Sequence, residues 1–259
     1  MSDDAPEPRW TSPGWQPPVV RPPTFGDVLW TATPRAWAAY AILAANVVVF
    51  AIMVVRGVHA QEPLERDLVR WGANFGPAVR TGEWWRLATS MFLHGGWLHV
   101  AMNMYGLYAI GPFVERLFGN AAFLALYLVA GLFGSLASVV THVHPPVVSV
   151  GASGAIFGIL GGLAGYLARH GRTSVPRAVV RGLTGNVLTV IALNVAIGLT
   201  IPQIDNSAHL GGLVSGFLLG FGLAMPLSPA GVARRRRRAA IVTVLGVAAV
   251  VAACVIISR

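Results

Sequence analysis

Long apolar blocks, separated by short polar segments, dominate the pattern of this chain. Each block is close to the roughly 20 residues that a helix needs to cross a hydrocarbon layer about 30 Å thick, although the fourth is short for a full span. The seven blocks cover residues 36–55, 93–110, 121–140, 152–168, 178–201, 207–225 and 240–257. The pattern therefore predicts an all-α fold, a polytopic bundle of membrane helices.

Composition agrees with a membrane protein. The chain is 55% hydrophobic and 11% charged, whereas soluble domains carry about 25% charged residues. Its 30 glycines are typical of membrane helices whose backbones approach closely. The net charge is +9 and every basic residue other than histidine is arginine. In a membrane protein, such charge indicates orientation rather than binding of nucleic acid.

The polar segments divide the chain into four parts. Residues 1–34 are rich in proline, which predicts a disordered cytoplasmic tail. Residues 35–226 hold six of the seven blocks and form the predicted main domain. A basic cytoplasmic linker is predicted at residues 227–239, and an additional C-terminal transmembrane helix at residues 240–259.

The distribution of arginine predicts the orientation. Arginines gather at residues 169–181 and 234–238, whereas the segments 141–150 and 202–206 contain none. The positive-inside rule then places the N-terminus in the cytoplasm and the C-terminus outside, in the cell membrane. The link at residues 57–92 also carries arginines, but acidic residues and tryptophans accompany them. We therefore predict that this link is a folded loop in the outer leaflet.

Two chemically active residues stand where apolar blocks begin. Ser153 lies in the sequence GASG and His209 in the sequence AHLGG. At about 1.5 Å of rise per residue, each lies roughly 24–25 Å above the inner end of its helix. Ionisable groups at such depth usually mark function, and serine with histidine is the minimal nucleophile and base of acyl transfer. The hypothesis that follows is a serine hydrolase working within the membrane.

The glycines around these residues have physical roles in that hypothesis. Gly151 and Gly154 flank Ser153 at a helix start, where free backbone N–H groups can stabilise an oxyanion. Glycine also lets a substrate strand approach. On the block that carries His209, small residues recur every four positions at Gly212, Gly216 and Gly220. This face predicts close packing of residues 207–225 on residues 152–168. Packing alone is the alternative explanation for the glycines.

Further polar residues extend the candidate site. His99 and Asn103 are four residues apart, hence on one helical face, and both can donate hydrogen bonds to a developing oxyanion. His94 falls near the outer interface, and we interpret it as structural. Asp205 precedes His209 by four residues. An orienting acid of a triad is one interpretation of Asp205, and a solvated loop carboxylate is the simpler one.

Four motifs together carry a resemblance to a known family. They are EWWR at residues 83–86, HVAMN at 99–103, GASG at 151–154 and AHLGG at 208–212. In this order they resemble the signature set of rhomboid intramembrane serine proteases, and with the flanking helices the resemblance covers residues 36–226. It implies a rhomboid-like six-helix core with a Ser–His dyad and no third acid, plus a seventh C-terminal helix as an addition found in part of the family.

The resemblance also implies roles for individual residues. Ser153 would be the nucleophile and His209 the general base. The oxyanion hole would consist of His99, Asn103 and the backbone N–H of Ser153. Gly151, Gly154 and Phe157 would serve substrate binding or packing, with Phe157 placed against the histidine. The remaining roles are structural and fall on Trp85, Arg86, Gly212 and Gly216.

The function predicted from these residues is an intramembrane serine endopeptidase whose site opens to the outer face. Its partners would be transmembrane protein substrates and the lipid bilayer, with no nucleic acid, no metal and no cofactor. Two alternatives belong to other classes. An inactive rhomboid-like chaperone or trafficking factor would bind membrane helices, but such relatives typically lack the serine or the histidine. A transporter or channel also carries intramembrane polar residues, but no inverted repeat is evident here.

Overall fold

The seven long helices of the fold correspond to the seven predicted apolar blocks. A computed structural model describes residue 16 and residues 21–201, 204–227 and 229–259. In that part of the chain, the helices of 18 residues or more are α2 (Ala38–Val55), α6 (Trp97–Phe118), α7 (Asn120–Thr141), α8 (Ser153–Ser174), α9 (Arg177–Thr200), α10 (Asn206–Leu223) and α11 (Pro229–Ile257). The predicted all-α helix bundle is confirmed.

The shorter elements connect these helices. They are α1 (Phe25–Ala32), α3 (Glu65–Trp71), β1 (Asn74–Phe75), α4 (Gly76–Arg80), α5 (Arg86–Thr89), the 3-10 turn η2 (Ser90–Phe92) and β2 (Val148–Ser149). Most of them lie between α2 and α6, where the sequence predicts a folded loop. At one end of the bundle, β1 pairs antiparallel with β2, so that Asn74 faces Ser149.

Among the described residues, four helices are long and apolar enough to cross a membrane: α2, α7, α9 and the part of α11 from Arg234 to Ile257. The other three long helices are α6, α8 and α10, which carry His99, Ser153 and His209. Their glycines and polar residues lower the mean hydropathy of these three helices. The chain is therefore a multi-pass membrane protein, and the three long helices outside this group carry the candidate site residues.

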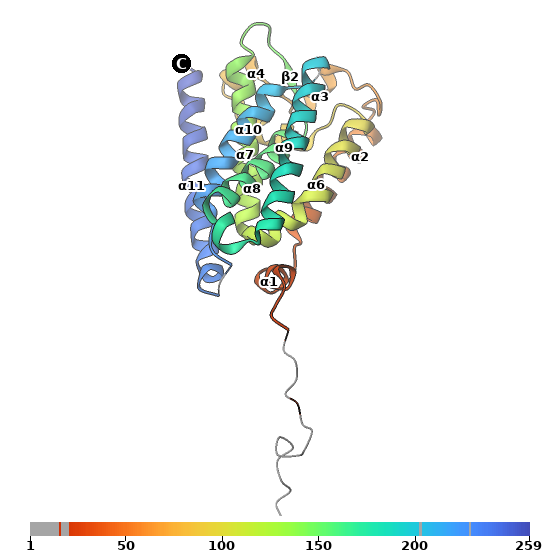
Figure 1. Ribbon diagram of the computed structural model, residues 1–259. Helices are drawn as coiled ribbons and strands as arrows, with labels where there is room; N and C mark the ends of the chain where they lie inside the picture. Colours follow the sequence, from red (N-terminus) through yellow and green to blue (C-terminus); the bar gives the residue numbers. More distant parts are fainter. Residues whose placement is uncertain (1–15, 17–20, 202–203, 228) are drawn as a thin grey trace, which may run out of the picture.

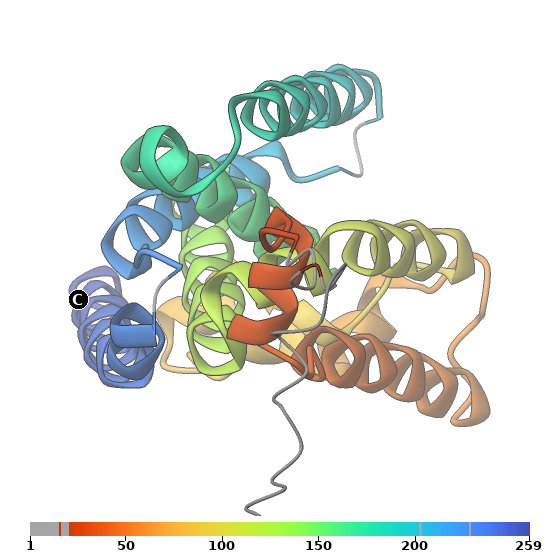
Figure 2. The same cartoon turned by 60° about the horizontal axis from the view of Figure 1, so that its bottom comes forward.

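The central helices of the bundle are α7, α8 and α10. α10 packs on α8 and α7, α11 packs against α7, and α2 packs against α6. Figure 1 shows the long helices side by side, with α11 at one flank and α2 and α6 at the other. α9 contacts chiefly α8 and is mostly exposed, and in Figure 2 it stands at the edge of the bundle. Among the described residues, the largest fully buried side chains are Tyr127 of α7 and Tyr166 of α8.

Paired glycines bring α8 and α10 into backbone contact. A Cβ atom built on Gly212 would collide with the backbone of Gly154. A Cβ atom on Gly216 would likewise collide with the backbone of Gly158, and one on Gly220 with the backbone of Gly162. The two backbones therefore meet along three successive turns, as the small-residue face of residues 207–225 predicts.

Two segments differ in structure from the predictions. Residues Phe25–Ala32, assigned to a disordered tail, form helix α1, because Thr24 and Asp27 make a capping box at its start. Pro6, Pro8, Pro13 and the other residues before 16 lie outside the described residues. The predicted linker at 227–239 is helical from Pro229 and continuous with α11.

Helix ends also differ from the ends of the apolar blocks. α8 runs on past residue 168 through Arg169 and His170 to Ser174, so it has 22 residues and is not short. α6 ends at Phe118, which places Glu115 inside the helix rather than at a loop. The Glu115 carboxylate is fully buried and accepts the backbone N–H groups of Ala38 and Ala39 at 2.8 Å. A carboxylate there satisfies the free N–H groups at the start of α2.

Candidate active site

Ser153 is the first residue of α8, and the backbone before it is held from two sides. β2 ends at Ser149 and pairs with β1, and the N–H of Gly151 donates to the carbonyl of Ser90 at 2.9 Å. Gly151 has φ +121°, a conformation that residues with a side chain rarely adopt. The turn thus presents the Ser153 hydroxyl at a helix N-terminus, where backbone N–H groups are unpaired by the helix.

The structure brings Ser153 and His209 together. Nε2 of His209 lies 2.8 Å from Oγ of Ser153, a hydrogen-bond distance between residues 56 positions apart. His209 is buried in the first turn of α10, at 7% exposure. The contact depends on the glycine pairs of α8 and α10, because Gly212 meets Gly154 within one turn of both side chains.

The ring of His209 is held flat against Phe157. The two ring centroids are 4.3 Å apart and the planes differ by 8°. Phe157 lies one turn after Ser153 on α8, so the stack and the hydrogen bond both fix the imidazole toward the serine. Stacking of this kind orients a ring without donating or accepting a hydrogen bond.

Asp205 makes no hydrogen bond to the His209 imidazole. Its Oδ1 accepts the backbone N–H of Ala208 at 3.0 Å, which makes it the N-cap of α10, and lies 3.9 Å from Nδ1 of His142. Among the residues that the structure describes, Nδ1 of His209 has no hydrogen-bond partner. In the part of the chain that the structure describes, the side-chain hydrogen bond of the His209 ring is the one to Ser153.

His99 lies beside the serine turn. The N–H of Gly95 donates to Nδ1 of His99 at 3.2 Å, so the neutral ring carries its proton on Nε2. A Cβ atom on Gly151 would be 2.8 Å from Cε1 and Nε2 of His99 and 3.8 Å from Oγ of Ser153. Nε2 is therefore a donor next to the serine, and any side chain at residue 151 would displace it.

Asn103 is buried on the same face of α6, but its amide is turned along its own helix. Nδ2 donates to the carbonyl of His99 at 2.9 Å. An amide nitrogen carries two N–H groups, and this bond uses one of them. The side chain of Asn103 is therefore tied to the turn of α6 that contains His99. The second N–H of its amide is not used by this bond.

His94 lies beside the site, whereas the sequence indicates only a structural role for it. His94 is completely buried, and its ring meets the ring of His99 edge-on, with centroids 5.2 Å apart. Nothing in the five-residue spacing from His94 to His99 indicates this contact. It depends on the turn at Gly96, whose φ is +118°.

Trp85 and Arg86 lie in the folded connection between α2 and α6. The Arg86 guanidinium is buried, pairs with Glu83 at 2.7 Å, and donates to the carbonyls of Val69 and Ala73. It also lies 4.7 Å from the centre of the Trp85 ring. These contacts fasten the C-terminal end of α3 to α5.

The arrangement has the parts that acyl transfer needs. A hydroxyl faces an imidazole nitrogen, and beside it stand a helix N-terminus and a histidine N–H that can stabilise negative charge. Within the described part of the chain, no group of three histidine, cysteine or acidic side chains is placed to hold a metal ion.

Comparison with known proteins places these features in a family. A family model described as the Rhomboid domain matches residues 81–226, more than half of the chain. The chain is 38% identical over 191 residues to rhomboid protease GluP of Bacillus subtilis, covering 74% of this chain and 36% of that relative. It is 36% identical over 233 residues to RHOMBOID-like protein 5 of Arabidopsis thaliana, covering 80% of this chain and 72% of the relative. The chain thus spans about a third of GluP and more than two thirds of the plant protein.

Proposed function

Because the chain belongs to the rhomboid family, we propose that it is an intramembrane serine endopeptidase that uses Ser153 as nucleophile and His209 as general base. The observation that carries the proposal is the 2.8 Å contact between Oγ of Ser153 and Nε2 of His209. A hydroxyl is a weak nucleophile unless a base takes its proton. Here the base is within reach and is held in place by the stack on Phe157.

The reaction follows from this contact. Oγ of Ser153 attacks the carbonyl carbon of the scissile peptide bond, and its proton passes to Nε2 of His209. The imidazolium then gives that proton to the leaving amine as the C–N bond breaks, which leaves an acyl-enzyme. A water molecule, deprotonated by His209, hydrolyses the ester and restores the serine hydroxyl.

Three donors stabilise the tetrahedral intermediate in this proposal. They are the backbone N–H of Ser153, Nε2–H of His99 and the second N–H of Asn103. The helix start at Ser153 and the closeness of the His99 ring to Gly151 support the first two. Asn103 lies one turn after His99, and its bond to the carbonyl of His99 leaves the second N–H for this role. The negative oxygen therefore forms where donors are already present, which is the condition for electrostatic stabilisation.

The proposed substrates are membrane proteins cleaved in or near a transmembrane segment. Ser153 and His209 lie near the ends of α8 and α10 that point away from the arginines at residues 177–181 and 234–238. With those arginines in the cytoplasm, the site opens toward the outer face, the N-terminus is cytoplasmic and the C-terminus is outside.

The test is cleavage of a single-span transmembrane reporter by purified protein in liposomes. Ser153→Ala and His209→Ala are expected to abolish cleavage and labelling by a fluorophosphonate probe. Ser215→Ala is the matched control, because Ser215 lies on α10 and its hydroxyl donates to the carbonyl of Gly211 on its own helix. Reporter cleavage that survives in Ser153→Ala would refute the proposal. Reporter binding by wild type without cleavage would instead indicate a helix-binding rhomboid-like protein.

A further inference from the structure

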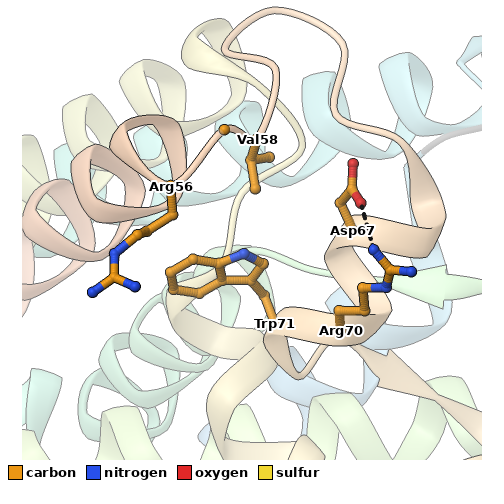
Figure 3. A pocket seen from close by; sticks show the side chains of 6 residues that line it. Arg56, Val58, Asp67, Arg70 and Trp71 are labelled. Carbon is orange, nitrogen blue, oxygen red and sulfur yellow. Dashed lines mark ion pairs between the residues drawn. The ribbon is translucent and has the colours of Figure 1, made fainter.

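A pocket with a volume of about 160 Å³ lies where α2 ends, apart from Ser153 and His209. It is lined by three residues that follow α2 and three residues of α3: Arg56, Gly57, Val58, Asp67, Arg70 and Trp71. Figure 3 shows the Trp71 indole between the side chains of Arg56 and Arg70. The volume suits a small polar group rather than a drug-sized molecule, which needs about 300 Å³ or more.

The pocket offers charges of both signs. Two guanidinium groups, from Arg56 and Arg70, stand on either side of the indole. The Asp67 carboxylate lies 3.9 Å from Arg70 and 3.8 Å from Arg66. Both distances are long for ion pairs, so the carboxylate keeps the capacity to bind another cation. Guanidinium groups recognise phosphate, and a carboxylate beside an aromatic face suits an ammonium group.

An exposed apolar stripe on α2 leads to this pocket. Val48, Ile52 and Val55 are 54%, 45% and 84% exposed and are four and three residues apart, so they share one face of the helix. Arg56 follows Ile52 by one turn on that face. α2 is apolar enough to cross a membrane, so its last residue, Val55, marks the level where hydrocarbon gives way to headgroups.

We propose that this pocket binds the headgroup of a zwitterionic phospholipid of the phosphatidylethanolamine type. The phosphate pairs with Arg56 at the end of the stripe on α2, the ammonium group meets Asp67 and the face of Trp71, and an acyl chain lies along the stripe. The apolar stripe is the reason to assign a lipid rather than a free phosphate ester. The site anchors the connection between α2 and α6 in the headgroup layer, and it does not depend on whether Ser153 is catalytic.

Native mass spectrometry of the full-length protein in detergent tests the assignment, with phosphatidylethanolamine and phosphatidylglycerol of identical acyl chains. Wild type is expected to bind phosphatidylethanolamine in preference. Arg56→Gln is expected to bind it about tenfold less, because charge-assisted hydrogen bonds to the phosphate are lost. Asp67→Asn is expected to bind both lipids alike, and this ratio does not depend on the folded fraction.

Arg66→Gln is the matched control. It removes the same charge and also a partner of Asp67, but Arg66 does not line the pocket, so lipid preference should persist. Equal binding of the two lipids by wild type, or undiminished binding by Arg56→Gln, would overturn the proposal. A third arm adds soluble glycerophosphoethanolamine, which has the headgroup without acyl chains. If this compound displaces the lipid at equal concentration, the pocket binds a free phosphodiester and the lipid proposal is overturned. If it does not displace the lipid, the result supports the proposal.

Discussion

Gly212→Ala tests whether backbone contact between α8 and α10 holds the candidate site together. A Cβ atom at residue 212 would overlap the carbonyl oxygen of Gly154 and approach its carbonyl carbon at 2.8 Å. Because these are backbone atoms, no side-chain rotation relieves the overlap, and the helices must separate. Overpacking of this kind costs about 1–3 kcal/mol of stability.

The expected effect on activity is larger than the effect on stability. Gly212 is three residues from His209, and Gly154 is next to Ser153. Separation of the helices at this point therefore lengthens the 2.8 Å hydrogen bond between Ser153 and His209. A misplacement of about 1 Å at reacting groups can cost about 10²-fold in rate. We therefore expect Gly212→Ala to label with a fluorophosphonate about a hundredfold more slowly than wild type, while most of the protein remains folded.

The assay compares the labelling rate, reporter cleavage in liposomes and the midpoint of thermal unfolding. Gly222→Ala is the matched control, because Gly222 lies on the same helix and a Cβ atom there would meet nothing within 4 Å. Its labelling rate should equal that of wild type, and its stability should rise slightly because alanine favours a helix. Labelling of Gly212→Ala at the wild-type rate would refute the reasoning, and so would an equal loss in Gly222→Ala.

Three further predictions concern single side chains. Glu115→Ala should lower the free energy of unfolding by about 2–4 kcal/mol, because two buried N–H groups of α2 lose a charged acceptor. Glu115→Gln should lose less, and equal thermal midpoints of the two variants would contradict this. Asp205→Asn should keep both activity and stability, since asparagine also caps helices and Asp205 makes no hydrogen bond to His209. A loss of cleavage as large as that of His209→Ala would favour a triad. Asn103→Ala should lower kcat at nearly constant KM, by less than the 10²–10³-fold typical of a sole oxyanion donor, whereas a raised KM with constant kcat would assign Asn103 to substrate binding.

The positions of the long helices and the packing of α8 on α10 could be predicted from the sequence. Apolar blocks of spanning length leave no alternative to helices in lipid, because every backbone polar group must be satisfied within its own segment. The four-residue spacing of Gly212 and Gly216 places both on one face, and only close packing accounts for such a face. Matching depths of Ser153 and His209 follow from the same helical rise, and together with the small-residue face of residues 207–225 they favour a contact between the two side chains.

Tertiary structure decided what depends on contacts between distant parts of the chain. Composition ends the fourth apolar block at residue 168, but α8 continues, because polar residues can extend a helix beyond the hydrocarbon. Glu115 looks like a loop residue until the start of α2 is placed against it. The edge-on contact of His94 with His99 has no counterpart in residue spacing. Helical periodicity is a local property and can be read along the chain. The position of a buried polar group depends instead on a distant hydrogen-bond partner, and that partner is known only when the helices are packed.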